Sequence, residues 1–192
     1  MNGALIPLAA LILLSACKTE DEAPKPVAMT AEAVGYYCQM NVLEHPGPKA
    51  QIHLKDMPYP LFFSQVRDAI AYQRMPEQEA QITAIYVSDM TKADWAEPGA
   101  ENWMSLDQSV FVIGSSQTGG MGASEAVPFS DHAAAAEFAA KFGGKIMALA
   151  EIPDSEILQA TDKPETTSAA PEGPDDYAAR LRALVQPAET QP

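Results

Sequence analysis

Residues 125–152 read EAVPFSDHAAAAEFAAKFGGKIMALAEI, and this stretch decides the fold of the C-terminal half. Its alanine-rich centre predicts a helix over 131–142, which Ser130 caps and Gly143-Gly144 ends. Apolar segments on either side predict strands over 125–129 and 145–152, and Pro128 places the first of them at a sheet edge. With a further strand at 109–114, the order is strand, strand, helix, strand.

The N-terminal half has the same expected order. Alternation of apolar and polar residues predicts a strand over 49–55, and a helical period follows over 61–74. The remaining two strands are expected around 34–38 and over 82–88. The sequence therefore predicts an α+β fold of two small pseudo-repeated strand-strand-helix-strand units packed together, 34–92 and 108–153, joined by a linker at 93–107.

Both ends of the chain are expected to lie outside these units. The apolar run at 4–16 is too short to span a bilayer, and Ser15-Ala16-Cys17 after it resembles the lipobox of bacterial lipoproteins. We therefore expect a signal peptide at 1–16, lipidation at Cys17 and a flexible polar tether over 17–33. The other end, 154–192, is expected to be a disordered tail that carries a short helix at 175–186.

The formal net charge of −14 on 192 residues excludes two classes of partner. A chain this acidic has no basic stripe with which to bind nucleic acid or anionic lipid headgroups. Attachment to a membrane must then come from the lipid on Cys17. Lys18, rather than an aspartate, follows that cysteine, so we expect the outer membrane, facing the periplasm.

The chain has two cysteines, and acylation of Cys17 would leave Cys38 without a disulfide partner. Cys38 lies in Cys38-Gln39-Met40, and another methionine lies in Gly119-Gly120-Met121-Gly122. A thiolate with thioethers suits a soft ion such as Cu(I). A structural zinc site would need four Cys or His ligands, whereas this chain offers one usable cysteine and three dispersed histidines. A blue-copper site is disfavoured because Cys38 comes early in the chain and two predicted helices interrupt the strands.

The alternative for each sulfur is a plain structural role. Free cysteine often packs as a small apolar residue, and methionine often fills gaps in a core. If the two units pack about a pseudo-twofold axis, the Cys38 and Met121 loops occupy matching positions and could converge at one cleft. Met90 and His45 are held in reserve as further ligands.

The combination of motifs resembles the nitrous-oxide reductase accessory lipoproteins, the NosL family. The resemblance covers about 34–150 and rests on the lipobox together with the following segments: Tyr37-Cys38-Gln39-Met40-Asn41-Val42, His45-Pro46-Gly47-Pro48-Lys49-Ala50-Gln51-Ile52, Tyr86-Val87-Ser88-Asp89-Met90, Asp94-Trp95, Gly119-Gly120-Met121-Gly122 and Glu125-Ala126-Val127-Pro128-Phe129. It implies a metallochaperone that binds Cu(I) through Cys38, Met40 and Met121. It also implies delivery of that copper for the copper-sulfide centre of nitrous-oxide reductase during denitrification.

Two other classes of function stay open from the residues alone. In one, the chain is a structural assembly lipoprotein that docks a periplasmic partner, and its sulfurs are core residues. In the other, it is a thiol-exchange enzyme that uses Cys38, although it has no Cys-x-x-Cys pair to resolve a mixed disulfide. The expected protein is a carrier and not an enzyme.

Overall fold

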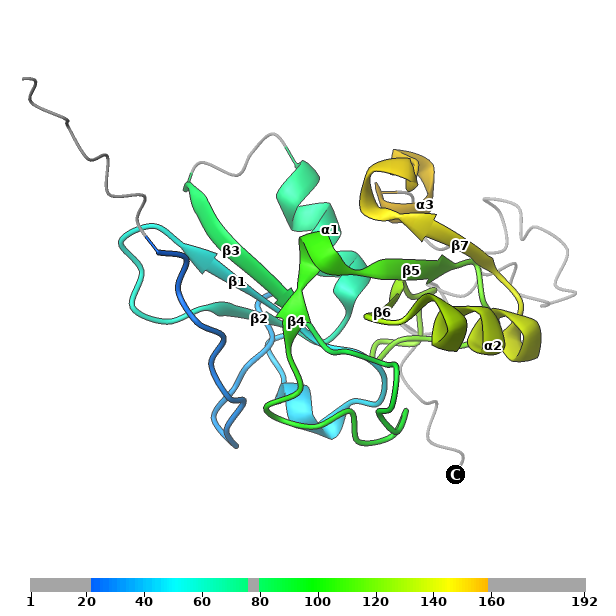
Figure 1. Ribbon diagram of the computed structural model, residues 1–192. Coiled ribbons are helices and arrows are strands. Elements are labelled where there is room, and N and C mark those ends of the chain that lie inside the picture. Colours follow the sequence, from blue (N-terminus) through cyan, green and yellow to red (C-terminus); the bar gives the residue numbers. More distant parts are fainter. Residues whose placement is uncertain (1–21, 76–79, 159–192) are drawn as a thin grey trace, which may run out of the picture. The chain divides into compact units, whose positions relative to one another are not determined.

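Two antiparallel sheets and three α-helices form the computed structural model, which describes residues 22–75 and 80–158 (Figure 1). The first sheet holds β1 (Ala50–Leu54), β2 (Leu61–Phe63), β3 (Ile82–Val87) and β4 (Met104–Ser105), in the order β2-β1-β3-β4. The second holds β5 (Val110–Ile113), β6 (Val127–Phe129) and β7 (Lys145–Ala148), in the order β6-β5-β7. This confirms the predicted α+β class, and both sheets are antiparallel. The signal peptide expected at 1–16, Cys17 and the helix expected at 175–186 fall outside the described residues.

Strand β1 is buried on both of its faces. Ala50, Ile52 and Leu54 point into the core with α1 (Val66–Arg74), as their alternation predicted. Gln51 and His53 point the other way, and they are buried as well. The cover on that side is the chain that precedes the first sheet.

The segment before residue 34 is held against the first sheet. Gln51 exchanges two side-chain hydrogen bonds with the backbone of Val27, at 2.8 and 2.9 Å, and the Tyr86 hydroxyl donates to the Pro24 carbonyl. Met29 is buried, and its backbone N–H donates to the Ala100 carbonyl. The prediction of a free tether over 17–33 is therefore wrong from residue 24 onward. The polar composition of this segment did not reveal the contact, because backbone groups make much of it.

Two boundaries in the first half differ from prediction. Residues 61–63 form strand β2 and not the first turn of a helix, because Phe62 pairs with Gln51 and its carbonyl accepts from the Tyr36 N–H. The helix begins only at Val66. The strand expected at 34–38 is reduced to two bridges, Val34 with Asn41 and Gly35 with Phe62.

The second half follows the expected order closely. Helix α2 (His132–Phe142) packs on the second sheet and ends at Gly143 and Gly144, whose φ angles of 75° and 98° favour glycine. Its N-cap is Asp131, which accepts from the Ala134 N–H, rather than Ser130. The strand predicted over 145–152 ends at Ala148, where a 3₁₀ turn (Leu149–Glu151) begins.

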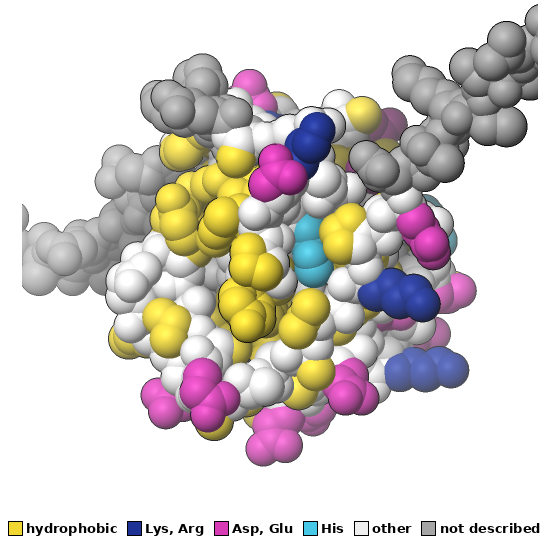
Figure 2. Space-filling model, turned by 90° about the vertical axis from the view of Figure 1, so that its left-hand side faces the viewer, with side chains coloured by type: hydrophobic (Ala, Val, Ile, Leu, Met, Phe, Trp, Pro, Cys, Tyr) yellow, Lys and Arg dark blue, Asp and Glu magenta, His cyan; other side chains and the backbone are white. Residues whose placement is uncertain are grey.

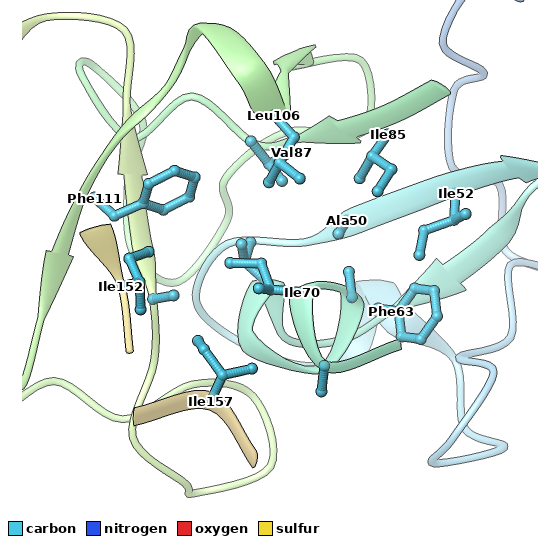
Figure 3. Packing of buried hydrophobic residues seen from close by; sticks show 14 of the residues in the cluster. Ala50, Ile52, Phe63, Ile70, Ile85, Val87, Leu106, Phe111, Ile152 and Ile157 are labelled. Carbon is cyan, nitrogen blue, oxygen red and sulfur yellow. The ribbon is translucent and has the colours of Figure 1, made fainter. Parts of the chain in front are cut away.

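One hydrophobic core joins the two halves (Figure 3). Phe111 of β5 packs in the same cluster as Ile70 of α1 and Val87 of β3. A smaller cluster between α2 and the second sheet contains Val112, Val127, Phe129, Ala135 and Met90. Because the larger cluster draws on both sheets, the halves are packed together as expected.

The folded body continues past the predicted start of the tail at 154. Helix α3 (Asp154–Leu158) buries Ile157, whose carbonyl accepts from the Arg67 Nε–H. Arg74 adds an ion pair with Asp154 at 2.9 Å. No helix within 22–75 or 80–158 has the length and apolar character needed to cross a membrane.

The two sulfur-bearing loops do not occupy matching positions in the two halves. Cys38 precedes β1, whereas Gly119–Gly122 lies between β5 and β6. The pseudo-twofold reason for expecting them to meet was therefore wrong. The two loops instead share a neighbour, Ser64, which each of them contacts.

Candidate metal centre

Cys38 lies in a tight turn that begins and ends at the paired residues Val34 and Asn41. The Gly35 N–H donates to the Met40 carbonyl at 2.9 Å, and the Gln39 N–H donates to the Gly35 carbonyl at 2.9 Å. Gln39 adopts a left-handed φ of 56° to close the turn. A Cβ on Gly35 would lie 2.5 Å from the Cys38 Sγ, so only glycine leaves room for the thiol there.

The Cys38 turn is fixed to the edge of β2. The Gly35–Phe62 bridge and the Tyr36 N–H, which donates to the Phe62 carbonyl at 2.7 Å, hold it there. Ser64, just after β2, directs its hydroxyl at the Cys38 Sγ over 3.6 Å. The thiol therefore lies beside the junction between β2 and α1.

The loop that carries Met121 packs against the same junction from the second half. A Cβ on Gly120 would lie 3.0 Å from the Ser64 carbonyl oxygen and 2.6 Å from the His45 Cβ. Gly120 must therefore remain a glycine for the loop to approach this closely. Ser64 thus contacts Cys38 with its side chain and the Met121 loop with its backbone.

All three predicted ligands are reachable from solvent. Cys38 is a partly exposed free thiol, and Met40 and Met121 are each 42% exposed. Within the described ranges, no group of three or more His, Cys, Asp or Glu side chains is placed to hold a metal ion. A metal at this position would therefore need the thioethers. That donor set suits a soft monovalent ion and is poor for Mg²⁺ or Ca²⁺.

The two reserve residues differ in their surroundings. Met90 is buried in the cluster under α2, and its backbone N–H donates to the Pro128 carbonyl. This packing role argues against Met90 as a ligand. His45 lies against Gly120, and its Nε2 is buried with no hydrogen-bond partner. It is an imidazole nitrogen left without a partner beside the Met121 loop.

A buried acid, Glu125, packs against the Met121 loop, and a buried base, Lys49, packs against the segment that follows His45. Glu125 is 3% exposed, and burial raises the pKa of its carboxyl to about 8. Lys49 is 1% exposed, and burial lowers the pKa of its ammonium to about 8, against the opposing charge of Glu125. The Lys49 Nζ donates to the Pro46 and Gly47 carbonyls, which follow His45.

Sequence reasoning missed Ser64, Glu125 and Lys49 as parts of this centre. Nothing in the neighbourhood of Ser64 distinguishes it from an ordinary loop serine. Lys49 lies immediately before β1 and Glu125 lies two residues before β6, and the nearness of each to a buried strand is the one signal for its burial in the sequence.

The comparisons with known proteins agree with one another. The family model described as NosL matches residues 26–157. The copper-binding lipoprotein NosL of Achromobacter cycloclastes is 56% identical over 185 residues, covering 94% of this chain and 93% of the relative. The protein of the same name from Stutzerimonas stutzeri is 28% identical over 160 residues, covering 82% of each chain.

A solved structure extends the likeness to the fold. The crystal structure of the copper chaperone NosL from Shewanella denitrificans matches with a TM-score of 0.64 at 31% identity, covering 68% of this chain and 97% of the other. These relatives carry names of binding and chaperone proteins rather than of an enzyme, in keeping with the expectation of a carrier. The family match spans both sheets, the Cys38 turn and the Met121 loop, and the chain therefore belongs to the NosL family.

Proposed function

We propose that this chain is a copper chaperone that carries one Cu(I) on Cys38, Met40 and Met121. The observation that carries the proposal is the meeting of the Cys38 turn and the Met121 loop at Ser64. A thiolate and two thioethers form a soft donor set that favours Cu(I). His45 stays in reserve as a nitrogen ligand because its Nε2 has no partner.

The recipient we propose is nitrous-oxide reductase or its assembly machinery, for which the copper would supply the copper-sulfide centre during denitrification. The support is the family membership and the resemblance in the motifs around Cys38 and Met121. The proposed location is the periplasmic face of the outer membrane, through acylation of Cys17, for example with palmitate. The lipobox pattern and Lys18 support this location.

Three sulfur ligands that solvent can reach suit a carrier that must also release its cargo. An open side lets a ligand of the recipient bind the ion before the last bond to the chaperone breaks, so free copper need not form. Because thiolate is the binding form of Cys38, Cu(I) displaces the thiol proton, and the affinity should fall as the pH is lowered.

The test is an anaerobic Cu(I) titration of the mature chain, residues 17–192, against a strong competing chelator. Cys17→Ser is included because an unacylated second thiol would also bind Cu(I). We expect one tight equivalent, followed by transfer to metal-free nitrous-oxide reductase in the presence of its assembly proteins. Absence of a tight equivalent would favour the structural assembly role instead.

An apolar surface adjoins the proposed ligands and suits contact with the recipient. The rings of Tyr36, Tyr37, Phe63 and Tyr72 pack together, with centroids 5.4–5.9 Å apart, and the Tyr37 hydroxyl lies 4.0 Å from the Met75 sulfur. Figure 2 shows one face of the molecule, where hydrophobic side chains lie across the centre with both acidic and basic groups around them. With a net charge of −14, the fitting partner is apolar with a basic rim.

A charge on this surface is expected to slow transfer without weakening copper binding. Met75→Glu places a carboxylate beside Tyr37, and we expect the transfer rate to fall roughly tenfold, equivalent to ~1.4 kcal/mol. Val27→Glu is the matched control, because Val27 is 41% exposed against 42% for Met75 but lies on the sheet face opposite α1. Stopped-flow transfer and chelator competition measure the two properties. Equal slowing by both variants would rule out this docking surface.

A further inference from the structure

Glu125 joins parts of both halves close to Ser64, which contacts both the Cys38 turn and the Met121 loop. Its Oε1 accepts from the Arg67 N–H and from its own neighbour, the Ala126 N–H, each at 2.9 Å. Its Oε2 is fully buried and has no hydrogen-bond partner. A buried carboxyl group with an unpaired oxygen is costly, so it calls for a role beyond filling space.

The bond to Arg67 reaches the Cys38 side of the centre. Arg67 is the second residue of α1, where the backbone N–H has no partner within the helix. The helix N-cap, Gln65, makes no side-chain capping bond, so Glu125 supplies the acceptor from the other half. This contact fixes the start of α1, and Ser64, which directs its hydroxyl at Cys38, lies two residues before that start.

The second oxygen of Glu125 faces the Met121 side. A Cβ on Gly119 would lie 2.4 Å from the Glu125 Oε2 and 2.3 Å from the Gln65 Nε2. Gly119 therefore packs directly on both side chains, and the loop closes above them through the Gly119 N–H, which donates to the Ala123 carbonyl. Gln65 bonds weakly to that same carbonyl at 3.4 Å.

We propose that Glu125 is a positioning residue that sets the separation between the Cys38 turn and the Met121 loop before copper arrives. It would do so by accepting from the Arg67 N–H at the start of α1 with Oε1 and by packing against Gly119 with Oε2. This inference rests on the proposed function, since it concerns the same three ligands. Glu125 touches no copper itself and acts only through Ser64 and Gly119.

The test combines Cu(I) affinity with a double-mutant cycle. Glu125→Ala should lower the affinity roughly 10- to 100-fold, the usual effect of losing a residue that orients a metal ligand. In a Met121→Leu background the same change should have little further effect, because the thioether that it positions is already gone. Glu125→Gln should restore most of the affinity, because it keeps the oxygen that accepts from Arg67.

Controls separate positioning from a general loss of stability. Gln51→Ala removes another fully buried polar side chain, one that holds Val27 and not the metal loops, and it should leave Cu(I) affinity unchanged. If Glu125→Ala does not fold, Gly119→Ala replaces it in the test, because the added methyl group would push against the Glu125 Oε2 and the Gln65 Nε2. Gly119→Ala should then lower Cu(I) affinity in the parent and have little further effect in the Met121→Leu background. An affinity loss that is equal with and without Met121 overturns the inference. Failure of the parent to bind Cu(I) overturns the proposed function instead.

Discussion

Cys38→Ser is expected to lower Cu(I) affinity by more than about 100-fold, beyond the loss usual for an outer-shell residue. Serine keeps the size and the Ser64 contact of Cys38, but its hydroxyl is a hard donor that does not ionise near neutral pH. The remaining Met40 and Met121 thioethers are neutral and cannot balance the charge of the ion. Chelator competition at several pH values measures the change, and the pH dependence of affinity that comes from the thiol should disappear with it.

The methionine variants show whether Cys38 acts with the proposed partners. Met40→Leu and Met121→Leu keep apolar volume and remove one sulfur each, so each should weaken binding roughly tenfold, about 1.4 kcal/mol. Met57→Leu is the matched control, because Met57 is also an exposed methionine, 53% exposed, in the turn after β1. If Cys38→Ser binds Cu(I) as tightly as the parent, the ligand set proposed here is wrong.

Helices and strands were predicted best where one signal dominated. The glycine pair after Phe142 and the alanine run before it defined α2 to within a residue. Strand β2 was missed because Leu61 and Phe62 fit a helical period, and pairing with β1 overrode that local preference. His53 stands at a polar position in the alternation along β1, yet it is buried, since that alternation cannot reveal that the chain at 24–29 covers the second face of the strand.

The candidate centre was only partly predictable for a similar reason. Sulfur chemistry and the spacing of Cys38 and Met40 can be read from the sequence, and so can the glycines around Met121. The contacts that bring the two loops together cannot, because Ser64 lies 26 residues from Cys38 and Arg67 lies 58 residues from Glu125. Such contacts follow from how the two sheets pack, which no local pattern specifies.

Glu125 should make the protein less stable as the pH rises, against the usual trend for carboxyl groups. Its folded pKa of about 8 exceeds the ordinary glutamate pKa of 4.5, so the folded state holds a proton that the unfolded chain releases between these two values. Its stabilising contribution is complete below pH 4.5 and is lost as the pH rises toward 8. Lys49, whose pKa is lowered from 10.5 to about 8, changes stability only above this window, where a rise in pH restores its contribution.

Glu125→Gln is therefore expected to gain stability relative to the parent as the pH increases. Glutamine imitates the neutral carboxyl group and cannot ionise, so the difference in free energy of unfolding should grow by up to ~1.4 kcal/mol per pH unit between about pH 5 and about pH 7.5. Urea unfolding at several pH values measures it, and Glu151→Gln is the control, because Glu151 is exposed on the 3₁₀ turn after β7. A difference that stays constant across this range would mean that Glu125 is already ionised in the folded protein, and that the cost of burying its charge is met by the N–H groups of Arg67 and Ala126.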